Sequence, residues 1–121
     1  MNKKTRYIAV FGIIAIFAGL FAWYNLTPGK YDQLADCLTE KGATFYGAFW
    51  CPHCQAQKQS FSKSASKLPY VECSTPDGKG TLPVCTDAGI TSYPTWEFAD
   101  GSRITGEKTP EFLAEKVACA I

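Results

Sequence analysis

An uncharged run of 20 residues near the N-terminus divides this chain into two parts. Residues 7–26, YIAVFGIIAIFAGLFAWYNL, contain no Asp, Glu, Lys or Arg. At about 1.5 Å of rise per residue, such a helix measures about 30 Å, the thickness of the hydrocarbon core of a bilayer. We therefore expect a transmembrane anchor over residues 7–26. Roughly 90 residues then remain, which is enough for one small domain.

The residues that flank the anchor predict its orientation. Lys3, Lys4 and Arg6 precede it, and Trp23 and Tyr24 lie near its far end. Basic residues favour the cytoplasmic side of a membrane, and aromatic residues favour its interfaces. We therefore expect a cytoplasmic basic tail over residues 1–6, a short linker over residues 27–30, and a domain over residues 31–121 in the periplasm or extracytoplasmic space.

A cleaved signal peptide and a buried core helix are the alternative interpretations of this segment. The run is longer than the apolar core of a usual signal peptide, and no Ala-x-Ala site follows it. It also stands outside the pattern of strands and helices in the domain. An anchor and a signal peptide both deliver the domain to an oxidising space, where the six cysteines predict disulfides. The net charge of +1 does not indicate a nucleic-acid partner.

The remaining residues alternate between helical and strand patterns. We expect helices over 31–41, 55–67, 83–88 and 109–120, and strands over 44–49, 70–73, 95–98 and 102–105. This order predicts an α/β sandwich, with a mixed sheet of about four strands flanked by helices. Trp96 is expected in its core. The last helix is expected to have one apolar face, made of Phe112, Leu113, Lys116, Val117 and Ala120. Three lysines are expected on a solvated helix face: Lys58, Lys63 and Lys67.

An aromatic strand runs directly into a Cys-x-x-Cys pair in FYGAFWCPHC, residues 45–54. Cys51 and Cys54 are placed at a helix start, where the partial positive charge of the helix N-terminus stabilises a thiolate. His53 adds a second positive charge or a donor, and Pro52 fixes the first turn. We expect Cys51 to be the nucleophile and Cys54 to resolve the mixed disulfide. Such stabilisation of the dithiol makes a disulfide more oxidising.

A zinc site and a purely structural disulfide are the alternatives for this pair. A zinc site needs two further ligands, but there is no second Cys-x-x-Cys and no His-x₃₋₅-His. A disulfide across so small a loop contributes little to stability. We expect no metal, and no cofactor besides the redox-active disulfide Cys51–Cys54.

Two motifs together resemble the thioredoxin superfamily: WCPHC after an aromatic strand, and YPT at residues 93–95. The Cys-Pro-His-Cys centre resembles that of the disulfide-forming oxidases of the DsbA group. The segments YGAFWCPHCQAQK, YVEC and SYPTWEF are similar to the thioredoxin-like domains that are fused to, or work beside, vitamin K epoxide reductase homologues. The resemblance covers residues 30–121.

This resemblance implies a thioredoxin-like sandwich with a substrate face near the Cys pair. Pro94 would be a cis proline facing the pair, and the backbone of Tyr93 would bind an extended substrate; the alternative is an ordinary loop proline. Trp50 would shape the substrate face, or simply pack. The chain departs from thioredoxin at Phe45, where thioredoxin carries a buried carboxylate. It also lacks the first strand of thioredoxin and the helical insertion of the DsbA group.

The other four cysteines allow three pairings. The related domains suggest a structural disulfide Cys73–Cys85, across a glycine-rich loop. Cys37–Cys119 then follows by elimination, although either cysteine left free, or relaying electrons to a partner, is the alternative.

These observations predict a membrane-anchored extracytoplasmic thiol–disulfide oxidoreductase. We expect it to form disulfides in exported cysteine-containing proteins. It would be re-oxidised by a quinone-linked membrane redox partner of the vitamin K epoxide reductase or DsbB type. The alternatives are a membrane-tethered reductase or isomerase, as in cytochrome c maturation, and a non-catalytic peptide-binding module.

Overall fold

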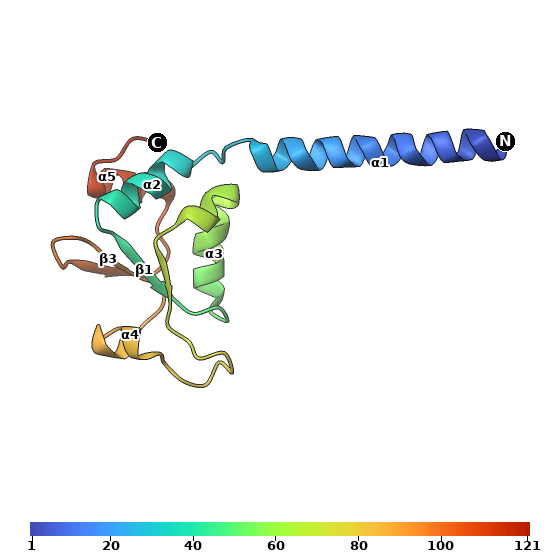
Figure 1. Cartoon of the computed structure of the whole chain (residues 1–121). Coiled ribbons are helices and arrows are strands. Elements are labelled where there is room, and N and C mark those ends of the chain that lie inside the picture. The colour runs from blue at the N-terminus through green and yellow to red at the C-terminus, as the bar shows by residue number, and fades with distance from the viewer.

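A computed structural model describes residues 1–121, and its first element is a long helix that extends away from the domain (Figure 1). This helix, α1 (Lys3–Leu26), buries none of its side chains and is long and apolar enough to cross a membrane. It begins before the expected span because lysine and arginine, which are good helix formers, continue it towards the N-terminus.

Lys63 connects the end of α1 to the domain. Its ammonium group donates to the main-chain carbonyls of Tyr24 and Thr27, and to the Thr27 hydroxyl at 3.2 Å. It also lies 4.6 Å from the centroid of the Tyr24 ring. The last carbonyls of a helix lack partners within the helix, and a lysine satisfies them here. The expectation that Lys63 belongs to a solvated face is therefore wrong.

The domain contains a mixed sheet of four strands in the order β2-β1-β3-β4. The strands are β1 (Thr44–Gly47), β2 (Tyr70–Glu72), β3 (Thr95–Glu97) and β4 (Arg103–Thr105). β1 pairs with β2 in parallel and with β3 antiparallel, and β4 returns along β3 as a hairpin. This confirms the expected α/β sandwich. β1 ends earlier than expected, at Gly47, where the chain leaves the sheet and turns towards the Cys pair.

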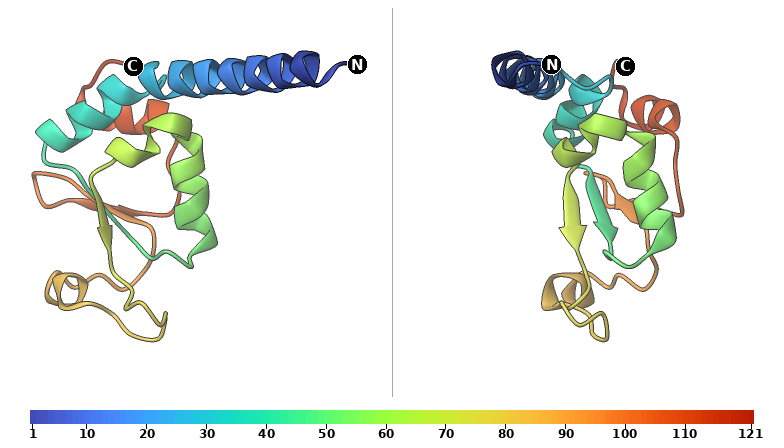
Figure 2. Two further views of the ribbon diagram at one scale, coloured as in Figure 1. Left: turned by 45° about the vertical axis from the view of Figure 1, so that its right-hand side comes forward. Right: turned by 90° about the vertical axis from the view of Figure 1, so that its right-hand side faces the viewer.

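Four α-helices and a 3₁₀-helix surround this sheet (Figure 2). They are α2 (Asp32–Glu40), α3 (Pro52–Ser60), the 3₁₀-helix η1 (Ser62–Lys67), α4 (Pro83–Asp87) and α5 (Pro110–Val117). The single helix expected over 55–67 is thus divided. Ser62 adopts a positive φ of 49°, so the chain bends after Phe61, whose ring is fully buried.

The two faces of β1 contribute to two hydrophobic clusters. Phe45 stacks on Trp96, with 4.9 Å between ring centroids, in the larger cluster, which contains the buried side chains of α2, α3 and α5. Tyr46 points to the other face and packs in a smaller cluster beside α4. Trp96 is in the core, as expected. Of the expected apolar face of α5, Leu113 is fully buried, whereas Phe112 is 43% exposed.

Two disulfides hold the domain together. Cys37–Cys119 joins α2 to the chain just after α5, and Cys73–Cys85 joins the end of β2 to α4. The first bridge is possible because α2 and α5, although at opposite ends of the domain sequence, pack against each other (Figure 1).

Removal of Cys37–Cys119 is expected to destabilise the domain more than removal of Cys73–Cys85. The bridges span 82 and 12 residues of chain. Chain entropy then predicts losses of about 4–5 and about 3 kcal/mol, respectively, in the free energy of unfolding. Urea unfolding of the two double Cys→Ser variants in detergent, followed by tryptophan fluorescence, measures both losses. A smaller loss for the Cys37–Cys119 variant would contradict the prediction.

Candidate functional site

Cys51 lies at the N-cap of α3 and Pro52 at its first turn. The Cys51 Sγ atom accepts a hydrogen bond from the backbone N–H of Cys54 at 3.3 Å. Both sulfurs are free thiols, and the residues are only 5% and 1% exposed. A thiolate at Cys51 would therefore be stabilised by a backbone donor and by the positive end of the helix.

The Tyr93–Pro94 segment lies against Cys51. Its peptide bond is cis, and the Cys51 thiol lies 3.8 Å from the Tyr93 carbonyl oxygen, to which it donates. The Tyr93 ring meets Trp50 edge-on, with 6.0 Å between centroids, and the Trp50 indole N–H donates to Ser74 at 2.9 Å. The structure thus brings Trp50, Tyr93 and Pro94 together around the Cys51 sulfur.

The side chains just before Cys51 form an apolar rim. Phe49 and Trp50 are both about half exposed although they are large and aromatic. Exposed apolar side chains beside a reactive group are typical of a surface that binds another protein.

His53 contacts a carboxylate from another part of the chain. Its side chain is 73% exposed, and its Nδ1 atom lies 2.6 Å from Oε1 of Glu107. Glu107 comes from the segment between β4 and α5. Sequence reasoning missed this carboxylate, because it is 54 residues from His53 and no motif contains it. A negative charge beside His53 opposes the effect that the sequence predicted for this residue.

Cys54 lies in the first turn of α3 and packs against β1. A Cβ atom at Gly47 would stand 2.9 Å from the Cys54 sulfur and 2.9 Å from Cε2 of Tyr70, so only glycine permits this approach. Burial, and after it the hydrogen bond with Cys51, raise the pKa of the Cys54 thiol to about 12.

Phe45, at the position of the thioredoxin carboxylate, lies between the rings of Trp96 and Tyr70 and gives this side of the site no charge. The charged side chain on this side of the site is that of Lys58. Its Nζ atom lies 3.5 Å from the centroid of the Tyr70 ring. The expectation that Lys58 belongs to a solvated face is therefore wrong, because a side chain of β2 holds it beside the Cys pair.

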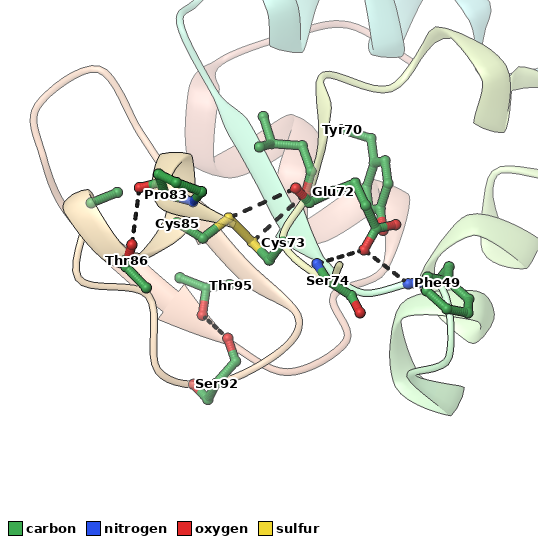
Figure 3. The surroundings of a disulfide bond; sticks show 12 residues. Phe49, Tyr70, Glu72, Cys73, Ser74, Pro83, Cys85, Thr86, Ser92 and Thr95 are labelled. Atoms are coloured by element: carbon green, nitrogen blue, oxygen red, sulfur yellow. Dashed lines mark hydrogen bonds between the residues drawn. A yellow bond between two sulfur atoms is a disulfide. The ribbon is translucent and has the colours of Figure 1, made fainter. Parts of the chain in front are cut away.

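Glu72 ties the end of β2 to the loop that precedes Cys51 (Figure 3). One carboxylate oxygen accepts from the backbone N–H groups of Phe49 at 3.1 Å and Ser74 at 2.9 Å. The other accepts from the Tyr70 hydroxyl at 2.7 Å. Burial and this hydrogen bond raise the pKa of Tyr70, so its hydroxyl stays a donor.

The chain is similar to proteins named for thiol–disulfide chemistry, although no protein-family model matches it. Thiol-disulfide oxidoreductase LTO1 of Arabidopsis thaliana is 49% identical over 87 residues, which cover 68% of this chain and 23% of that protein. Protein disulfide-isomerase A2 is 37% identical in Pongo abelii and 36% in Homo sapiens, over 81 residues that cover 59% of this chain and 15% of each relative. The chain thus spans less than a quarter of the length of these relatives.

The fold and the similarities agree with each other. A mixed four-stranded sheet with flanking helices is a thioredoxin-like architecture, and it places a Cys-x-x-Cys pair at a helix N-terminus. Together with the relatives, this supports a thiol–disulfide oxidoreductase of the thioredoxin-like superfamily.

Proposed function

We propose that this protein is anchored in a membrane by α1 and forms disulfides in exported cysteine-containing proteins. The observation that carries the proposal is the arrangement of the two thiols. Cys51 lies at the positive end of α3 beside an apolar rim, whereas Cys54 is buried behind it. The apolar α1 carries basic residues at its N-terminal end and has none directly after its C-terminal end, which supports the placement of the domain outside the cytoplasm.

The reaction is a thiol–disulfide exchange. A substrate thiolate attacks Cys51 of the oxidised pair, the Cys51–Cys54 bond breaks, and its electron pair passes to Cys54. A second substrate thiolate then attacks the substrate sulfur of the mixed disulfide and releases Cys51 as a thiolate. The substrate has lost two electrons, and the Cys pair holds them.

Substrate binding is assigned to the surface around Cys51. An extended segment would pair with the backbone of Tyr93, and its apolar side chains would contact the exposed rings of Phe49 and Trp50. The cycle closes when two electrons and two protons leave the Cys pair for a quinone-linked membrane partner of the vitamin K epoxide reductase or DsbB type. An anchored domain keeps the Cys pair close to such a partner.

The second candidate is a membrane-tethered reductase or isomerase. The contact between His53 and Glu107 favours it, because the carboxylate offsets the positive charge that a protonated His53 would add to make the disulfide oxidising. Phe45 favours the first candidate, since no carboxylate there assists Cys54 when substrates are reduced.

The variant Cys54→Ala is expected to accumulate mixed disulfides between Cys51 and exported proteins, because the resolving thiol is missing. Acid-quenched cells, non-reducing electrophoresis and mass spectrometry of the adducts would detect them. The double variant Cys51→Ala, Cys54→Ala is the control and should trap nothing. If the single variant also traps nothing, the protein is a peptide-binding module rather than an enzyme.

The reduction potential of the Cys pair separates the two candidates. A reduction potential of about −120 mV supports the oxidase, and one of about −270 mV supports the reductase. Glu107→Gln should raise the potential by about 10–20 mV, the size expected when one partner of an exposed ion pair is removed. Equilibration with glutathione buffers measures both values.

The exposed Glu115 of α5 provides the control for the Glu107 substitution. Glu115→Gln makes the same change of net charge away from the Cys pair and should leave the potential unchanged. Equal potentials for wild type and Glu107→Gln would mean that the His53–Glu107 pair does not influence the redox equilibrium.

A further inference from the structure

Cys54 must become a thiolate in a buried site that disfavours negative charge. In the exchange proposed above, on which this inference rests, Cys54 leaves as a thiolate when substrates are oxidised. It attacks as a thiolate when the pair is re-oxidised. The residue is only 1% exposed, and burial raises the pKa of its thiol to about 12. The rate of each step therefore depends on what stabilises this thiolate.

The structure places one cation beside this sulfur. Lys58 follows Cys54 by one turn of α3, so the two side chains lie on the same face of the helix. That face meets Tyr70, and the Lys58 ammonium group lies 3.5 Å from the centroid of its ring. The Tyr70 ring and the Cys54 sulfur are themselves neighbours across Gly47.

Hydrogen bonds fix this arrangement from the side of β2. The Tyr70 hydroxyl donates to Glu72, which is held by two backbone N–H groups (Figure 3). The ring that supports Lys58 therefore cannot swing away from α3 without loss of a hydrogen bond. Glu72 is occupied by these three donors and is not aimed at the sulfur.

The charged and titratable neighbours of the buried thiol come from two elements. α3 presents Cys51 and Lys58, and β2 presents Tyr70 with Glu72 behind it. β1 adds only Gly47 and main-chain groups, which carry no charge. Lys58 is the one cation among them, and its charge acts on the sulfur to favour the thiolate.

We propose that Lys58, held over the Tyr70 ring, is a positioning residue that stabilises the Cys54 thiolate in both directions of the exchange. When a substrate thiolate opens the disulfide, the electron pair of the broken bond arrives at Cys54 beside the ammonium group, and a proton from solvent follows. On re-oxidation Cys51 is first joined to the oxidised partner in a mixed disulfide. The proton of Cys54 leaves to solvent, the Cys54 thiolate attacks the Cys51 sulfur, and the sulfur of the partner leaves as a thiolate. Tyr70 and Glu72 hold the lysine in place.

A two-step reaction of the reduced full-length protein with one equivalent of an aromatic disulfide tests this role. Cys51 attacks first and releases one coloured thiolate. Cys54 then attacks Cys51 in the mixed disulfide and releases the second. The first phase thus tests whether Cys51 carries out the proposed exchange. The rate of the second phase measures the reactivity of Cys54. Both are followed by stopped-flow absorbance across a pH series.

Lys58→Met should slow the second phase about threefold at each pH below the pKa of Cys54. A pKa rise of about one unit lowers the thiolate fraction about tenfold, and the more basic thiolate is about threefold more nucleophilic. The first phase should not change. Lys58→Arg keeps the charge and should restore the second phase to the wild-type rate. The matched control is Lys116→Met, because Lys116 of α5 lies 5.3 Å from the centroid of the Phe98 ring, in the same kind of contact.

The outcomes separate the two hypotheses. If wild-type protein lacks the first phase, the proposed function fails and this inference fails with it. If both phases occur and Lys58→Met matches wild type in the second, only the role of Lys58 is overturned. A Lys58→Arg variant as slow as Lys58→Met also overturns it, because the loss would then reflect packing rather than charge.

Discussion

The close approach of α3 to β1 at Gly47 is the constraint on which the rest of the site depends. Because Gly47 has no side chain, Cys54 packs directly on the sheet, and the Tyr70 ring packs beside it. The N-terminus of α3 then stands at the end of β1, where Cys51 meets the Tyr93 carbonyl. A single glycine therefore determines which cysteine packs against the sheet and which lies beside Tyr93.

The two thiols acquire different chemistry from this one packing arrangement. Cys51 receives the backbone donor of the first helical turn, whereas Cys54 loses its solvent and gains a high pKa. Phe45 strengthens the contrast, since a stacked aromatic residue occupies the position from which a carboxylate would act on the buried thiol. The proposed order of attack, first Cys51 and then Cys54, follows from this contrast, because both thiols are buried but only Cys51 receives the backbone donor.

The sequence predicted those features that depend on local pattern. The order of the elements and the helix start at the Cys pair follow from periodicity and from proline and glycine signals. It did not predict Glu107 or the contact of Lys58 with Tyr70, because each depends on which distant segments the sheet brings together. The break at Ser62 was also missed, since Ser62 is an ordinary helix residue by composition and adopts its positive φ where the chain bends around the buried Phe61.

The charges around the pair affect two different quantities. With a pKa of about 12, Cys54 is protonated at neutral pH in the reduced protein, so a cation beside it contributes little to the redox equilibrium. It acts on the rate, where the thiolate is transient. The equilibrium depends instead on what surrounds Cys51, namely the helix N-terminus and His53, with Glu107 opposing them. The direction of electron flow and the speed of exchange can therefore be changed by substitutions at different residues of the same small site.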